Sequence, residues 1–439
     1  MTTVSGAPPE SDAPASATGS RAWLLWLLPL AMLLHGRTAT LDLAVSVLVV
    51  LAIVAYWGRA EFVALAGFFV AYSPVLFLYD GGPSLVNVYL VAYAARVLSG
   101  RVRLRIASIG FGAFVLLAVS AMVLTQYVTA LEWLTVLLGG LALWGVLTEL
   151  RDPDTVALRQ QFVRMCVYGG LSAVLYGVLN ERVIEASLGL GGLERYLGTQ
   201  NDPNFMAMLL CACLGFVWSI DAHRFPTKLL MAAGLVAGIT LTGSLTGLIC
   251  TVISLAVYVA MRTARGTTTS SLILAVAALA IVGGTVILMA NSGLLPATLQ
   301  VRFSEASVEL TGRDITSLTS GRSDIQGQYL AFWRDQDIFR QLFGGYGVSV
   351  LALVGEPFSM IGLATHNTFL DVLFTCGLLG LLLFVVLILT SLRQAVTAFR
   401  SQADQVALSF FVAKVVWVLF AFSLSVFPSW TYLLLLLAV

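Results

Sequence analysis

The polar residues that could act on a substrate lie in three short segments, each next to a long apolar segment. In one of them Arg322 precedes Ser323, and Gln326 follows three residues after that serine. This spacing is a capping box, and it predicts a helix that runs to about Phe343. The free N–H groups and the dipole of a helix N-terminus favour an anion such as phosphate, and Arg322 would add its own charge there. The alternative is a solvent-exposed arginine paired with Asp324 or another acid of the same loop.

The second segment places a histidine at the expected start of a helix. Thr365 is the expected N-cap, His366 and Asn367 follow it, and Asp371 lies about one turn further on. A histidine near a helix N-terminus is biased towards its neutral form, which can accept a proton from a sugar hydroxyl or donate a hydrogen bond to a phosphate. The alternative is a polar anchor at the membrane interface.

The third segment combines an expected helix cap with residues that the cap does not explain. Asp202 as N-cap and Pro203 as first helical residue follow from structural preference alone. Arg195, Asn201 and Asn204 remain. We expect these three residues to face the same cavity as the loop that contains Arg322.

No metal or cofactor is expected. The chain has only three histidines, which makes a histidine-based metal site improbable. Asp335 and Asp337 are two residues apart, so on a helix they point in different directions. The five cysteines all fall within apolar segments, where a thiol usually acts as a small hydrophobic group.

Lys414 differs from these residues because it lies near the middle of an apolar segment. An ionisable group inside a membrane span is costly and is a functional hypothesis by default. The alternatives are a side chain that reaches towards the interface or a structural pair with Asp371.

The elements that must position these residues are long and apolar. Of 439 residues, 59% are hydrophobic and 11% are charged, whereas roughly 25% of the residues in a soluble domain are charged. A polytopic integral membrane protein of all-α class with about 12–14 transmembrane helices is expected. The apolar segments cover residues 22–35, 41–57, 60–79, 84–98, 106–128, 130–149, 162–179, 203–220, 228–243, 245–261, 271–292, 366–391, 405–422 and 429–439.

Orientation follows from the positive-inside rule. Arg96, Arg101, Arg103 and Arg105 lie between two apolar segments and predict a cytoplasmic loop. Strict alternation from there puts most of the 24 lysines and arginines inside and residues 293–365 outside. The expected site of action is therefore the outer face of the cytoplasmic membrane.

Four regions are expected along the chain. Residues 1–20 form a disordered cytoplasmic tail, 21–292 a transmembrane helix bundle, 293–365 a large periplasmic-side loop that contains helices, and 366–439 the C-terminal transmembrane helices. The first apolar segment is short enough to be a signal peptide, but its polar leader favours a retained helix. The net charge of +1 recruits no nucleic acid, so the expected partners are the lipid bilayer and a membrane-bound substrate.

The order of these motifs resembles the O-antigen ligase and Wzy-type polymerase superfamily of bacterial envelope glycan enzymes. The resemblance spans residues 195–390 and rests on Asn201-Asp202-Pro203-Asn204, Gly243-Ser244, Ser320-Gly321-Arg322, Gly344-Gly345-Tyr346-Gly347, and His366-Asn367 with Gly377 and Gly380 downstream.

The resemblance implies a GT-C-like membrane fold and an inverting, metal-independent glycosyltransferase. Such an enzyme moves a glycan from a polyprenyl (undecaprenyl) diphosphate carrier to a sugar hydroxyl, as a polysaccharide polymerase or as a ligase. Arg322 matches the loop arginine that holds the diphosphate, and His366 matches the histidine needed for activity. Asn367, Tyr346 and Asn204 are expected to help bind the substrate.

One departure from the family pattern concerns a second arginine. Family members commonly have Ser-Arg where this chain has Ser244-Leu245. Arg195 or Arg313 is expected to take the place of the missing arginine.

Two other functions remain open. A transporter or flippase of lipid-linked sugars would need a polar path near the bilayer midplane and often has duplicated halves, and the sequence shows neither. The peptidoglycan polymerases of cell shape and division are also polytopic with a long outer loop, and the Ser-Gly-Arg and His-Asn pattern matches them less well.

Overall fold

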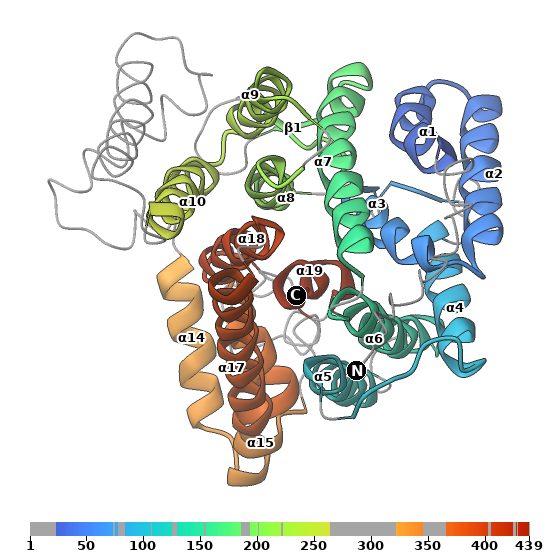
Figure 1. Cartoon of the computed structure of the whole chain (residues 1–439). Coiled ribbons are helices and arrows are strands. Elements are labelled where there is room, and N and C mark those ends of the chain that lie inside the picture. Colours follow the sequence, from blue (N-terminus) through green and yellow to red (C-terminus); the bar gives the residue numbers. More distant parts are fainter. Residues whose placement is uncertain are drawn as a thin grey trace, which may run out of the picture.

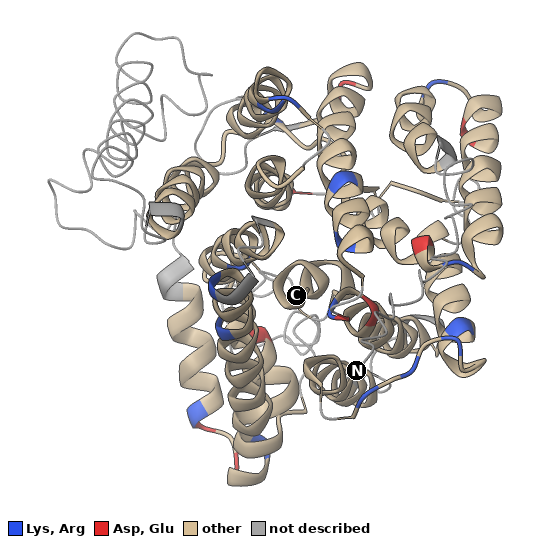
Figure 2. Ribbon diagram, viewed as in Figure 1, with Lys and Arg blue, Asp and Glu red and all other residues tan. Residues whose placement is uncertain are grey.

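The computed structural model describes residues 23–72, 75–77, 84–106, 108–124, 130–152, 155–185, 194–200, 202–220, 223–263, 322–345, 366–402, 405–424, 427 and 429–438. This part of the chain is mostly helical. The helices pack beside one another as a bundle (Figure 1), and the apolar core extends through it. Figure 2 shows how few charged residues its helices carry.

The helices of the first half are α1 (Trp23–Ala31), η2 (Met32–Leu34), α2 (Ala39–Tyr56), η3 (Ala60–Ala64), α3 (Leu65–Tyr72), α4 (Leu85–Leu98), α5 (Ile109–Leu124), α6 (Ala130–Leu150) and α7 (Val156–Leu179). Those that follow are α8 (Pro203–Val217), α9 (Phe225–Leu241), α10 (Leu245–Thr263), α14 (Arg322–Arg334), α15 (Ile338–Phe343), α17 (Thr368–Gln402), α18 (Gln405–Ala421) and α19 (Trp430–Leu437).

Helices coincide with each predicted apolar segment except 271–292, which lies outside the described residues. Four of them are long and apolar enough to cross a membrane, within Ala39–Tyr56, Trp133–Leu150, Val156–Leu179 and Thr368–Arg400. The chain is therefore a membrane-associated helical protein. Shorter apolar helices complete the bundle, and α19 is buried at its centre (Figure 1).

Hydrogen bonds link segments that lie far apart in the sequence. The side chain of Asn180 donates to the carbonyl of His35, and the Thr368 hydroxyl donates to the carbonyl of Leu424. The Trp57 indole donates to the carbonyl of Ala92, within α4. Each bond ties a helix end or the connection beside it to another part of the bundle.

A short hairpin departs from the expected all-α class. β1 (Val183–Glu185) pairs antiparallel with β2 (Glu194–Tyr196), and Ile184 lies opposite Arg195. The segment is too short to cross a membrane, and its Val-Ile pair favours an extended backbone. The hairpin matters because it fixes the position of Arg195.

The predicted helix from Ser323 to Phe343 is wrong as a single element. It consists of α14 and α15, because the Asp337 carboxylate accepts the Arg340 N–H at 3.0 Å and caps a new helix start. Aspartate competes for backbone N–H groups in this way and so favours caps over helix interiors. Gly344, at φ 75°, ends α15 as predicted.

The helices α14 and α15 dock onto the first part of α17. Tyr329 and Phe332 pack against Phe374, with ring centroids 5.4 and 6.3 Å apart. Gly377, at φ 68°, interrupts α17 directly after this contact. A Cβ atom on Gly377 would lie 2.3 Å from the carbonyl oxygen of Leu342, so α15 reaches α17 only because residue 377 is a glycine.

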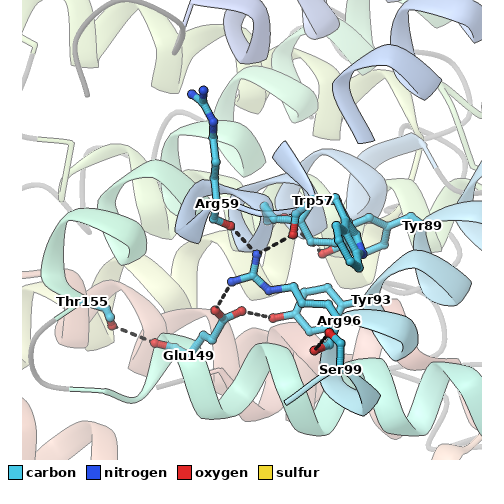
Figure 3. A network of polar contacts seen from close by, with 9 residues as sticks. Trp57, Arg59, Tyr89, Tyr93, Arg96, Ser99, Glu149 and Thr155 are labelled. Atoms are coloured by element: carbon cyan, nitrogen blue, oxygen red, sulfur yellow. Dashed lines mark hydrogen bonds and ion pairs between the residues drawn. The ribbon is translucent and has the colours of Figure 1, made fainter. Parts of the chain in front are cut away.

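A buried ion pair ties α4 to α6 at the end of the bundle that the sequence assigns to the cytoplasm (Figure 3). The Arg96 guanidinium lies 2.5 Å from Glu149, and it also donates to the carbonyls of Trp57 and Arg59. Tyr93 donates its hydroxyl to the same carboxylate. The arginine thus closes the η3 turn against two helices, which is a structural role.

Lys414 is fully buried in α18 and donates to the Ser391 hydroxyl at 2.6 Å. Asp371 lies in the first turn of α17, whereas Ser391 lies beyond the Gly377 kink, in the second half of the helix. The alternative of a structural pair with Asp371 does not hold, because the amine binds Ser391 in the second half of α17.

Candidate functional site

Arg195 lies where three helix ends meet. Its Nε donates to the carbonyl of Thr242 at the end of α9, 3.1 Å away, and its Nη2 donates to the side-chain oxygen of Asn204 at 3.2 Å. The same oxygen accepts the Ser244 hydroxyl at 2.9 Å. Arg195 and Asn204, two predicted site residues, are thus in direct contact at the starts of α8 and α10.

Local sequence explains why these helix ends can meet. Gly243, at φ 62°, allows the sharp turn between α9 and α10. Ser244 then caps α10 by accepting the Gly247 N–H at 3.1 Å. Leu245 is the first residue of α10. The Arg195 guanidinium therefore reaches the start of α10, where the chain has Leu245 in place of the arginine that the resemblance implies.

The start of α8 has the predicted cap. Asp202 accepts the Asn204 N–H at 2.6 Å, and Pro203 is the first helical residue. The carboxylate of Asp202 offsets part of the positive potential that two helix N-termini and Arg195 create together. The positive charge is therefore confined to Arg195 and the two helix N-termini and does not form a wide basic surface.

Gln200 and Tyr432 extend this end of the bundle towards its centre. The Tyr432 hydroxyl donates to the side-chain oxygen of Gln200 at 2.7 Å, and Gln200 donates to the carbonyl of Ala71 at 3.0 Å. Phe205 stacks on the Tyr432 ring with centroids 5.3 Å apart. These contacts hold the start of α8 rigidly against α19 and α3.

His366 lies one residue outside the N-cap of α17. Its backbone has φ 49°, which is uncommon for a residue other than glycine and is found mostly at turns and functional sites. Asn367 caps the helix, because its side-chain oxygen accepts the N–H groups of Phe369 and Leu370 at 3.0 and 3.2 Å. The expected N-cap, Thr365, is therefore wrong: Asn367 takes the cap, and Thr365 itself lies outside the described residues.

Arg195 and Asn204 lie at the same end of the bundle as His366 and Asn367. Thr368, next to Asn367, is tied to the end of α18 through its hydrogen bond to Leu424. Tyr432, near the start of the following helix α19, contacts Gln200 and Phe205 at the start of α8. The short segment between α18 and α19 therefore connects the start of α17, beside His366, with the start of α8, beside Arg195.

The remaining predicted site residues belong to the long loop. Arg322 is the first residue of α14, and its side chain is outside the described part. Arg313 and Tyr346 also lie outside the described residues. The described piece of this loop is anchored to α17 through Tyr329 and Phe374, eight residues after His366.

Sequence reasoning missed Thr242, Gln200 and Tyr432. Thr242 acts through its carbonyl, which no side-chain pattern reveals. The bond between Gln200 and Tyr432 joins residues from opposite halves of the chain. Asn367 as a cap was detectable, because asparagine is among the preferred N-cap residues.

Among the described residues, no group of three or more His, Cys, Asp or Glu side chains could hold a metal ion. The site offers instead a guanidinium, two helix N-termini, side-chain amides and an imidazole. The chain matches no protein-family model and no curated protein.

Proposed function

We propose that this protein is a membrane glycosyltransferase that moves a glycan from a polyprenyl diphosphate carrier to a sugar hydroxyl at the outer face of the cytoplasmic membrane. The observation that carries the proposal is the position of Arg195. Its guanidinium reaches the start of α10, where the O-antigen ligase and Wzy-type polymerase superfamily places an arginine that this chain lacks.

The arrangement suits a diphosphate leaving group. Charge develops on the bridging oxygen as the bond between the anomeric carbon and the diphosphate breaks. A preorganised cation at the N-termini of two helices stabilises that charge more in the transition state than in the ground state. Arg195 is preorganised because Thr242 and Asn204 hold its guanidinium from two sides.

His366 supplies the second function of the site. The acceptor hydroxyl attacks the anomeric carbon with inversion, and its proton must leave. His366 either takes that proton as general base or holds the donor by a hydrogen bond. His366→Gln separates the two roles, because glutamine retains hydrogen bonding but cannot act as a base. A large loss in kcat indicates the base, and a rise in KM at little-changed kcat indicates donor binding.

The test in cells compares the glycans of a deletion strain complemented with wild type, His366→Ala, Arg322→Ala or Arg195→Ala. The proposal predicts normal insertion of each variant, loss of the long or linked glycan, and accumulation of the lipid-linked donor on the outer face. Arg37→Ala is the matched control, because Arg37 is an exposed arginine expected on the same side.

Two results would contradict the proposal. Donor that accumulates on the cytoplasmic face would indicate a transporter or flippase. Variants that insert normally and make wild-type glycan would remove these residues from the site. The structure of the product, longer chains or a glycan joined to another acceptor, distinguishes a polymerase from a ligase.

A further inference from the structure

A cavity of about 630 Å³ opens at the other end of the bundle, between α5, α6, α7 and α17. It contains residues from the loop before α5, the end of α6 and the second half of α17, all on the side assigned to the cytoplasm. Its polar lining consists of Arg105, Ser108, Thr148, Arg151, Arg159, Thr390 and Gln394. The proposed transfer site lies at the opposite end and does not use it.

Three arginines from three separate segments converge on this cavity. Arg151 is held in place because it donates to Gln394 and to the carbonyl of Leu437, the latter at 2.5 Å. Arg159, in the first turns of α7, is only 5% exposed. Arg105 is exposed at the mouth. No Asp or Glu is among the described residues that line the cavity.

Arg151 remains charged at neutral pH. Burial lowers its pKa to about 10, which is still well above 7. Arg105 and Arg151 face no Asp or Glu within the described lining, so an anion is the complementary ligand. The start of α5 adds to the attraction, because Ser108 precedes the first turn of that helix and accepts the Phe111 N–H at 3.3 Å.

The rest of the wall is apolar. Leu147, Leu383, Leu387 and Phe111 line the cavity, and Ile106 beside them is 71% exposed. Leu382, Val386 and Leu389 are exposed apolar residues along the adjoining part of α17. A ligand with an anionic head and long apolar chains fits both surfaces, whereas a free anion leaves the apolar wall uncovered. Basic pockets between membrane helices on the cytoplasmic side commonly bind such lipids.

We propose that this cavity binds the phosphate headgroup of an anionic glycerophospholipid, with its acyl chains along α5 and α17. The lipid joins α5, α6, α7 and α17 from the side opposite the transfer site. This inference is independent of the proposed function.

The test uses the full chain in detergent and counts bound lipids by native mass spectrometry. Phosphatidylglycerol is titrated against zwitterionic phosphatidylcholine and inorganic phosphate. Arg105→Gln removes one cavity charge, and Arg103→Gln is its control, because Arg103 is exposed two residues away and does not line the cavity. Thr390→Phe fills the cavity and leaves every charge in place.

Wild type is expected to bind phosphatidylglycerol more tightly than phosphatidylcholine. Arg105→Gln should weaken that binding about fivefold, the effect of one cation near a lipid headgroup. Thr390→Phe should abolish the preference, and Arg103→Gln should keep it. Equal binding of the two lipids, or equal losses in Arg105→Gln and Arg103→Gln, would overturn the proposal. Displacement of the lipid by an equal concentration of inorganic phosphate would show that the site takes a free anion instead.

Discussion

Arg195 makes two contacts that depend on the fork shape of the guanidinium. Its Nε donates to Thr242 and its Nη2 donates to Asn204. A lysine has the same charge, but its three N–H donors share one nitrogen, so it does not reproduce the separate positions of Nε and Nη2. The position of the charge, and not only its sign, is therefore part of the proposed site.

We expect Arg195→Lys to lower the transfer rate by about 10²–10³, the usual effect of removing one preorganised donor at a developing negative charge. The rate is measured on purified protein with a polyprenyl diphosphate glycan donor. Arg37→Lys is the matched control and should leave the rate unchanged. A wild-type rate in Arg195→Lys would show that this fork geometry does not contribute.

His223 is a second residue whose surroundings predict a measurable effect. It lies between α8 and α9, and Tyr168 shares a hydrogen bond with its ring. Burial, followed by the nearby charges of Arg164 and Lys228, lowers the pKa of His223 below its ordinary value of 6.5. The folded protein thus binds a proton at His223 less readily than the unfolded chain does.

Because the pKa is lower in the folded state, the contribution of His223 to stability is complete above pH 6.5 and is lost as the pH falls below that value. We expect the thermal midpoint in detergent to fall between pH 7 and pH 5, and His223→Gln to reduce this dependence. A pH dependence that is the same in His223→Gln and wild type would contradict the assignment.

At the scale of elements, the docking of α15 onto α17 depends on Gly377. A Cβ atom there would lie 2.3 Å from the Leu342 carbonyl oxygen and 2.4 Å from the Gly344 nitrogen. The backbone also has φ 68°, a conformation that disfavours any residue with a side chain. Both effects act on the contact of α15 with α17.

We expect Gly377→Ala to lower the stability of this docking by about 1–3 kcal/mol or more, from backbone strain and the added contact. Limited proteolysis should then cleave the α14–α15 segment faster. Gly327→Ala is the control, because Gly327 lies in α14 with open space around its Cβ position. Equal protease resistance in Gly377→Ala and wild type would show that the helices do not need this close approach.

The sequence predicts some of these helix boundaries and not others, and the reasons are physical. Apolar helices such as α2 and α7 were predictable because the thickness of the bilayer sets their length. The Asp202-Pro203 start of α8 was predictable because both residue types have strong positional preferences. The break between α14 and α15 was not, because Asp337 suits a cap only when the chain turns there.

The candidate site was predictable as a set of residues and not as an arrangement. Arg195 and Asn204 were expected to face one cavity, but their shared contact with Ser244 depends on the β1–β2 hairpin and on the packing of α8 with α10. The choice of Asn367 over Thr365 as cap depends on the backbone of His366. These are long-range or conformational facts that spacing along the chain does not contain.

At the scale of the whole molecule, the Arg96–Glu149 pair stabilises the end of the bundle away from the proposed site. The two side chains are 5% and 15% exposed, and Arg96 also binds two backbone carbonyls (Figure 3). Removing one partner leaves the other charge buried without compensation, which costs more than replacing both.

We expect Arg96→Met to destabilise the protein by about 3–5 kcal/mol, and the double variant Arg96→Met, Glu149→Met to be less destabilised than Arg96→Met alone. Unfolding in mixed micelles measures both. The pair lies away from the proposed transfer site, so we expect folded Arg96→Met to retain wild-type transfer per molecule. A double variant that is less stable than Arg96→Met would contradict this view of the pair.

Glycan transfer from a polyprenyl diphosphate is the activity that we propose for this chain. Purified protein in liposomes, given that donor and a chelator of divalent metals, measures this activity without other enzymes. We expect release of free polyprenyl diphosphate together with an elongated or newly linked glycan, and loss of both products in His366→Ala. Intact donor that only moves between the two leaflets, with no polyprenyl diphosphate released, would rule this activity out.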